Sequence, residues 1–480
     1  MYFLNQRIFH CKQAKTDNYC YLFVVSTLCI ALVGCANLSV QTLFSHYSAA
    51  LEKTRMLTSR GQYQAALTSF PNTLYSDILT GMERGRLALL AGDAVLSQSI
   101  LQKVDTQVTE QQRQAIMPLS EGLNQVGSLF SNNNMLTYSP PGYELGFMHL
   151  YLMLNYLRKS DLDGALVEAR RANYVQKNAL QLRAKELKQI KNTIQQNGIS
   201  DNIGAIISHY PDAGKMLGGV QNGYLFYLSG LLHEIERNLN SAFIDYNRAL
   251  AVEPNNTYVA ESAKRVAIKQ GRQSALILLE KKYGPYVQPV HNSATLVILN
   301  EQNIVNARHA WRLPLWLYDN HNNLVSYSVS LPYYRSLFNT PQGAILIDDI
   351  LVKPLQLTDV NAMAQQFLNE SLPSMAARQV LRIVAKNAVR KSLAEQNKRG
   401  INNLVANIFN VLSDQPDTRS WQTLPQTAGV YSGFYPAGQH VVTADGKIIN
   451  IILKSDQITL LWLFRHGGNV IYWQSFLSGI

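Results

Sequence analysis

Residues 143–176, YELGFMHLYLMLNYLRKSDLDGALVEARRANYVQ, decide the fold of this chain. Residues 146–157 are apolar on nearly every side, which predicts a helix that neighbouring elements cover completely. After a turn at 158–160, apolar residues recur at the spacing of one buried helical face: Leu162, Ala165, Leu166, Ala169 and Ala172. The stretch therefore predicts a helical hairpin on which further helices must stack.

Other segments between Leu43 and Lys282 predict similar helix pairs, at 43–59 with 62–70, 77–90 with 94–104, and 223–236 with 240–252. Residues 61–67, GQYQAAL, resemble the turn and second-helix start of a tetratricopeptide (TPR) repeat. Four residues of the last pair match the small, aromatic, small and proline positions of that repeat: Ala242, Tyr246, Ala249 and Pro254. We expect a TPR-like array in which each pair buries one face against the next, interrupted by a polar helix at 177–197.

Beyond Gly284-Pro285 the apolar period becomes two, and residues 324–331 alternate cleanly. The other predicted strands are 295–299, 313–318, 344–350, 429–435, 440–443, 447–453, 459–464 and 469–473, with helices at 359–372, 374–396 and 401–412. Asp445-Gly446 and Gly467-Gly468 are hairpin turn signals. We expect a mixed domain that ends in an antiparallel meander.

The apolar run 21–34 follows a basic segment and is too short for a membrane span of roughly 20 residues. It ends in Leu32-Val33-Gly34-Cys35, which resembles the lipobox of bacterial lipoproteins. The resemblance implies cleavage before Cys35 and lipidation of that cysteine, and Ala36 at the next position favours the outer membrane. The alternative is an uncleaved signal anchor.

Composition agrees with an exported protein. The cysteines are Cys11, Cys20, Cys29 and Cys35, so a mature chain would keep the anchor alone and could form neither a disulfide nor a cysteine metal site. The formal charge of +11 favours anionic lipid headgroups or cell-wall polymers as partners. No nucleic-acid-binding module is recognisable. The predicted fold class is α+β multidomain: a signal peptide (1–34), a TPR-like helical-repeat domain (35–283) and a C-terminal α+β domain (284–480).

Residues 417–425, DTRSWQTLP, followed by Pro436-Ala437-Gly438, resemble the C-terminal signature of an uncharacterised family of TPR-containing bacterial lipoproteins. Segments 155–172 and 376–386 are similar to two further motifs of that family. The resemblance implies lipid-anchored helical repeats with a mixed C-terminal domain and brings no catalytic residues. Some members are encoded beside lipoproteins that activate cell-wall synthases, which hints at envelope assembly.

No catalytic, cofactor or metal site is predicted. His233-Glu234-Ile235-Glu236-Arg237 begins like the HExxH zinc motif, but Arg237 stands where the second histidine is needed. The chain has no GxSxG or GxxxxGK[ST] motif. We expect that the protein is not an enzyme.

Two segments are candidates for interaction. Arg378, Arg382, Lys386 and Arg390 recur every four residues on one predicted helix. They form either an electrostatic patch for anionic lipid or polymer, or a solvated face. In segment 417–425, Arg419 could make bidentate contacts and Trp421 could stack on a sugar. Alternatively, Arg419 pairs with Asp417 and Trp421 fills the core.

The expected function is that of a lipid-anchored scaffold or adaptor at the periplasmic face of the bacterial outer membrane. It would hold an envelope protein or peptide on the concave face of the helical array, with anionic lipid or a cell-wall polymer as a further partner. The alternative is a carbohydrate-binding or carbohydrate-active lipoprotein that acts through the C-terminal domain.

Overall fold

The computed structural model describes residues 47–70, 77–116, 138–196, 221–290, 292–318, 324–335, 341–396 and 416–477. All of them belong to one compact unit that begins at His46. Cys35 and the predicted helix 401–412 lie outside the described residues.

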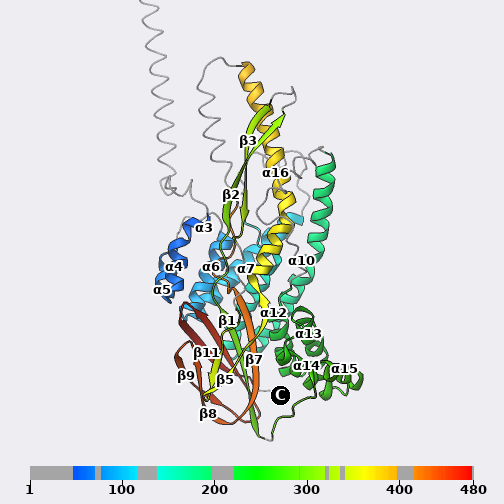
Figure 1. The fold of residues 1–480 in the computed structure, drawn as a ribbon, viewed down its shortest axis with the longest axis vertical. Helices are drawn as coiled ribbons and strands as arrows, with labels where there is room; N and C mark the ends of the chain where they lie inside the picture. Colours follow the sequence, from blue (N-terminus) through cyan, green and yellow to red (C-terminus); the bar gives the residue numbers. More distant parts are fainter. Residues whose placement is uncertain are drawn as a thin grey trace, which may run out of the picture. The chain divides into compact units, whose positions relative to one another are not determined.

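The described helices up to Tyr283 are arranged as consecutive pairs (Figure 1). After the short α3 (Tyr47–Ala50), the pairs are α4 (Glu52–Ser59) with α5 (Tyr63–Thr68), α6 (Asp77–Leu90) with α7 (Ala94–Ile116), α9 (Gly142–Arg158) with α10 (Leu162–Gln196), α12 (Gly223–Ile235) with α13 (Leu239–Val252), and α14 (Thr257–Lys269) with α15 (Gln273–Tyr283). The predicted pairs are confirmed, and the prediction for α6 matches both of its ends. The predicted polar helix is confirmed as far as Gln196, but it is not an insertion: residues 177–196 continue α10.

Each pair turns through one residue with positive φ, two positions before the start of its second helix. These residues are Gly61, Gly92, Ser160, Arg237 and Gly271, with φ between 58° and 90°. In three pairs the next side chain caps the second helix: Asp93 accepts a hydrogen bond from the Leu96 amide, Asp161 from Gly164 and Asn238 from Ser241. The shared turn sets a common register, so equivalent positions of the second helices can be counted from it.

The remaining elements form three sheets and one long helix. The strands are β1 (Ser293–Gln302), β2 (His309–Tyr318), β3 (Leu324–Tyr333), β4 (Ile345–Ile347), β5 (Ile350–Val352), β6 (Leu355–Asp359), β7 (Thr427–Pro436), β8 (Gly438–Ala444), β9 (Lys447–Leu453), β10 (Ile458–His466) and β11 (Asn469–Leu477). The described sheets have the strand orders β11-β10-β1-β7-β6, β2-β3 and β5-β4-β8-β9. We call the first the central sheet and the last the outer sheet.

The predicted C-terminal meander is wrong. After the β8–β9 hairpin of the outer sheet, the chain returns to the central sheet, where β10 pairs in parallel with β1. The sequence of β10, ITLLWLFRH, is a nearly continuous apolar run, and its residues 458–465 are buried. A strand buried on both faces requires an interior position in a sheet, which the place between β1 and β11 provides.

Helix α16 (Val360–Gln396) replaces the two helices expected at 359–372 and 374–396. Pro373, which we expected to separate them, lies inside the helix. Leu372 and Ala376 on either side of it are buried, so packing holds the helix together despite the hydrogen bond that proline cannot make.

The helix pairs and the central sheet share one hydrophobic core, which includes Leu154 of α9, Leu228 of α12 and Trp462 of β10. A second cluster lies between the central and outer sheets. The predicted domain boundary at 283–284 coincides with the change from α15 to strands, but the residues on its two sides pack into the same core. No helix among the described segments combines the length and apolar character needed to cross a bilayer.

Candidate functional site

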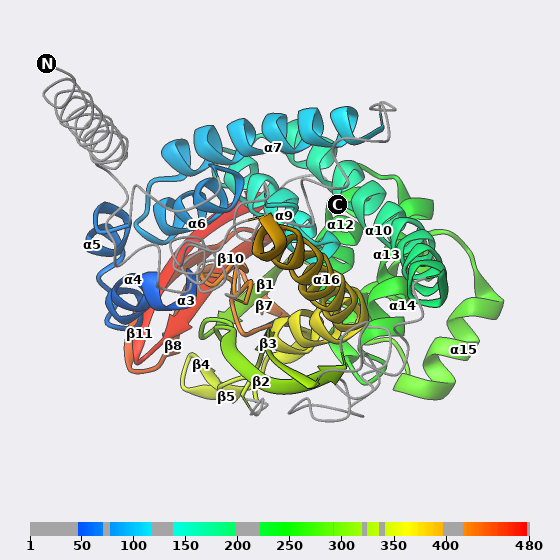
Figure 2. The same cartoon turned by 90° about the horizontal axis from the view of Figure 1, so that it is seen from above.

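The first helices of the pairs face the central sheet and the segment 417–425. Arg55 of α4 donates to the Gln422 carbonyl at 3.0 Å. Tyr224 of α12 donates to Glu301 of β1 at 3.2 Å, and Asn256, the cap of α14, donates to the Gln356 carbonyl of β6 at 2.8 Å. The inner face of the array is therefore occupied by the protein's own chain, and Figure 2 shows the helices around the strands. This corrects the expectation that a partner binds on the concave, inner face of the helical array.

Glu301 is the centre of the contact between helices and sheet. Its carboxylate accepts hydrogen bonds from Arg86 of α6 at 2.5 Å and from the Trp462 indole at 2.9 Å, in addition to the Tyr224 hydroxyl. The Arg86 guanidinium also lies 4.2 Å from the centre of the Tyr151 ring, a cation–π contact. Glu301 and Arg86 are both fully buried, so this cluster is structural rather than a binding site.

Two further buried carboxylates bind the segment 417–425. Glu83 of α6 accepts hydrogen bonds from the Gln422 amide at 2.6 Å and from the amide and hydroxyl of Thr423 at 3.1 and 2.6 Å. Glu144 of α9 accepts one from the Trp421 amide at 2.9 Å. Burial raises the pKa of Glu83 to about 7 and also raises the pKa of Glu144, although these hydrogen bonds favour the ionised forms.

Arg419 and Trp421 are buried side chains of that segment. Arg419 is 4% exposed and forms a salt bridge of 2.8 Å with Asp417. Burial opposes the ionisation of Asp417, but Arg419 outweighs it and holds the pKa of Asp417 below its usual value. Trp421 is 1% exposed and donates its indole N–H to the Thr423 hydroxyl at 3.1 Å. The structural alternative, in which Arg419 pairs with Asp417 and Trp421 fills the core, therefore describes both residues.

The predicted basic helix is α16. Arg378 is exposed and donates to the Ser374 hydroxyl at 3.0 Å. The side chains of Arg382, Lys386 and Arg390 lie outside the described residues, so the electrostatic patch remains a prediction.

The second helices present the surface of the array that the sheet leaves open. We count positions in each second helix from the residue that precedes it, which is Asp161 for α10, Asn238 for α13 and Arg272 for α15. The sixth position after it is Val167 in α10, Ile244 in α13 and Leu278 in α15, and these side chains are 48%, 43% and 68% exposed. Exposed aliphatic side chains thus occupy equivalent places on three successive second helices. With their basic neighbours Arg170, Arg248 and Lys281 they form what we call the second-helix face.

Polar contacts also recur at equivalent positions of the second helices, and one of them connects α10 to α13. Seven and ten positions after the cap, Glu168 pairs with Arg171 in α10 at 3.2 Å, and Asp245 pairs with Arg248 in α13 at 3.1 Å. Twelve positions after it, Asn173 of α10 donates across to Asp245 at 3.4 Å. Arg170 and Arg248 stay 58% and 51% exposed, so both can also reach the carboxylates of a partner.

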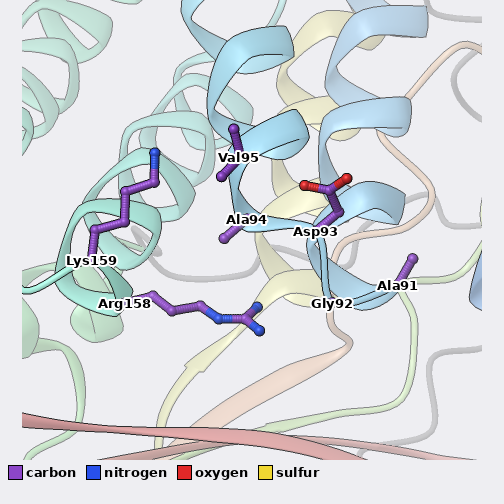
Figure 3. Close-up of a pocket in the computed structure, with 7 residues that line it drawn as sticks. All are labelled: Ala91, Gly92, Asp93, Ala94, Val95, Arg158 and Lys159. Carbon is purple, nitrogen blue, oxygen red and sulfur yellow. The ribbon is translucent and has the colours of Figure 1, made fainter.

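An open pocket of about 520 Å³ lies where two inter-helix turns meet (Figure 3). It is lined by Ala91, Gly92, Asp93, Ala94, Val95, Arg158 and Lys159. Val95 is 65% exposed, and Lys159 donates to Gln98 at 2.5 Å. In Figure 3 the Arg158 guanidinium extends towards Gly92. The pocket therefore has a cation beside the apolar side chains of Ala91, Ala94 and Val95.

The described residues contain no cluster of histidine, cysteine and carboxylate side chains that could hold a metal ion. His233 and Glu234 of the HExxH-like segment are buried, 6% and 1% exposed. Glu234 forms a salt bridge of 2.7 Å with Arg265 of α14. The segment joins two helix pairs.

The buried carboxylates that face the sheet and the segment 417–425, those of Glu83, Glu144 and Glu301, were not predicted. Their signal in the sequence is weak, because each is an isolated acid within or beside an apolar run. Such a pattern indicates a buried charge but does not identify its partner.

Comparison with solved structures finds TPR proteins. The C-terminal part of a TPR repeat-containing protein from Cytophaga hutchinsonii is 13% identical, with a TM-score of 0.21, over 48% of this chain and 76% of that chain. The TPR2AB domain of yeast Sti1 in its complex with pHSP90 is 12% identical, with a TM-score of 0.17, over 48% of this chain and 89% of that chain. No family model and no curated protein matches the chain.

Proposed function

We propose that this protein is a lipid-anchored, non-enzymatic adaptor of the bacterial envelope that binds an acidic, aliphatic segment of a partner protein on the second-helix face. The observation that carries the proposal is the repetition of exposed aliphatic residues, Val167, Ile244 and Leu278, at equivalent positions of three second helices. An extended or helical segment that crosses these helices would meet one aliphatic side chain on each of them.

Charge supports an acidic partner. Arg170, Arg248 and Lys281 stand beside the aliphatic residues, and the whole chain carries a formal charge of +11. Complementary charge accelerates association and selects partners, so binding should weaken as salt rises. Anchoring rests on the resemblance of residues 32–35 to a lipobox, and location in the outer membrane rests on Ala36 directly after it.

The alternative of a carbohydrate-binding protein depended on an accessible Trp421. A tryptophan that stacks on a sugar must present its ring, and Trp421 is 1% exposed. No other observation on the described residues favours it.

The test is site-specific photo-crosslinking in intact envelopes. A photoreactive residue at position 244 should yield a discrete adduct, and Val167→Glu should remove that adduct while leaving the melting temperature nearly unchanged. The control is Leu351→Glu, at an aliphatic site on the outer sheet that is even more exposed (70%), which should leave the adduct intact. The proposal fails if position 244 gives no adduct beyond that obtained from position 351, or if Val167→Glu leaves the adduct unchanged.

A further inference from the structure

Strand β9 forms an edge of the outer sheet. Among the described strands it pairs with β8, through the two-residue turn Asp445-Gly446, whose φ angles are both positive. In such a hairpin the residues next to the turn, Ala444 and Lys447, form the first hydrogen-bonded pair, and bonded and non-bonded pairs then alternate. Ile448, Asn450 and Ile452 therefore direct their backbone N–H and C=O groups away from β8, to the open edge.

The side chains of the same three residues are also exposed. Ile448 and Ile452 are 66% and 49% exposed, and Asn450 between them is exposed, whereas Ile449 and Ile451 are in the core. Proteins usually protect a long apolar edge, because it promotes pairing with another strand. β9 thus combines unpaired backbone groups with an open apolar surface.

The other edge strands of the outer and central sheets are either short or in contact with other parts of the chain. The opposite edge of the outer sheet, β5, has three residues. In the central sheet, the edge strand β6 is covered by Asn256, which donates to the Gln356 carbonyl, and Asn469 of the edge strand β11 donates to the Ser59 carbonyl of α4 at 3.4 Å. β9 is therefore the edge most available for association.

We propose that two copies of this protein associate by antiparallel pairing of their β9 strands about a twofold axis at Asn450. Residues 448–452, IINII, read the same in both directions about Asn450. A twofold axis there places Ile448 opposite Ile452 of the second copy and Asn450 opposite itself, so the interface is self-complementary.

This register satisfies the free backbone groups. Ile448, Asn450 and Ile452 become the hydrogen-bonded pairs of the new ladder, while their side chains stay on the outer surface and Ile449 and Ile451 stay in the core. The register also brings Lys454 opposite Gly446 of the second copy. A contact of one strand pair is small, so the dimer population should rise with protein concentration.

The register is tested by disulfide trapping in the full-length protein with its four native cysteines replaced by serine. The Cα atoms of two opposed residues 450 would lie about 5.5 Å apart, within the reach of a disulfide. Asn450→Cys should therefore give a covalent dimer on mild oxidation. The matched control is Val441→Cys, because Val441 lies opposite Asn450 on β8 and is also exposed. Two residues 441 would be about 14 Å apart, beyond that reach.

A second variant separates association from folding. Asn450→Pro removes one amide that points to the open edge, so the monomer should keep its pairing with β8 and its melting temperature. It should shift the protein from dimer to monomer in sedimentation measurements at the concentration where the wild type is dimeric. A wild-type protein that stays monomeric at every concentration overturns the proposal. So do equal cross-linking of the two cysteine variants and a dimer that persists in Asn450→Pro.

Discussion

Arg86 of α6 and Glu301 of β1 form an ion pair in which neither side chain has any exposed surface. The two residues are far apart in the chain, one in the helical array and the other in the central sheet. A buried charge is stabilised when its partner and its hydrogen bonds are in place, and removing one partner leaves the other charge without compensation. The pair therefore couples the folding of the array to that of the sheet.

We predict that Arg86→Met lowers the free energy of unfolding by about 3–5 kcal/mol, because Glu301 would stay buried without its cation. Denaturant unfolding measures the loss. The double variant Arg86→Met with Glu301→Gln should recover part of it, since the uncompensated charge is removed with its partner. A single variant as stable as the wild type would contradict the role assigned to the pair.

Glu83 should make stability depend on pH. The pKa of its carboxyl is raised from 4.5 to about 7 in the folded protein. Between these values the folded state keeps a proton that the unfolded state has released, so the stabilisation present below pH 4.5 is lost as pH rises to about 7. Glu83→Gln cannot titrate, and its melting temperature should decline less than that of the wild type over this range. Glu110→Gln, at a side chain that is 56% exposed, is the control and should follow the wild type. Parallel curves for Glu83→Gln and the wild type would show that Glu83 does not titrate in this range.

Ala169 of α10 should not tolerate a charge. Ala169 is fully buried between helices, so Ala169→Glu places an unpaired carboxylate in the core. It should lower the free energy of unfolding by several kcal/mol, roughly the cost of burying an unpaired charge. Val167→Glu makes the same kind of change two residues away at a position that is 48% exposed, and it should cost little. Thermal unfolding compares the two variants. Equal melting temperatures would mean that the faces of α10 are assigned incorrectly.

Cys35→Ser should abolish lipid labelling and release the protein from the membrane fraction. The reason is the resemblance of Leu32-Val33-Gly34-Cys35 to a lipobox, in which the cysteine carries the lipid. Cys29→Ser changes a cysteine within the apolar run and should leave labelling unchanged. Retention of Cys35→Ser in membranes to the same extent as the wild type would favour an uncleaved signal anchor.

Most elements could be predicted because their signals are local. Helix α6 and strand β9 have the predicted ends, since the period of their apolar residues and the turn residues beside them, such as Asp445-Gly446, lie within a few positions. The repeat register could also be found locally, because a glycine or polar residue marks each turn. Pro373 shows the limit of such signals, since tertiary packing keeps α16 continuous through it.

The roles of the candidate site residues depended on contacts that are remote in sequence. From the sequence, Arg419 and Trp421 could be either residues that bind a partner or residues of the core. The structure shows that they are core residues. The segment 417–425 is buried under α6 and α9, whose carboxylates Glu83 and Glu144 accept hydrogen bonds from its backbone. No local pattern could supply that answer, because the binding groups lie more than 270 residues away.

The amino-acid sequence by itself determined the helix pairs, most of the strands and the basic charge of this protein, since these follow from neighbouring residues. Only the tertiary structure decided that the central sheet fills the inner face of the helical array and that β10 lies parallel to β1. The physical reason is that apolar periodicity states which face of an element must be buried, but not against which other element. That choice depends on the fit of shape, charge and hydrogen bonds across the whole core, as between Arg86 and Glu301.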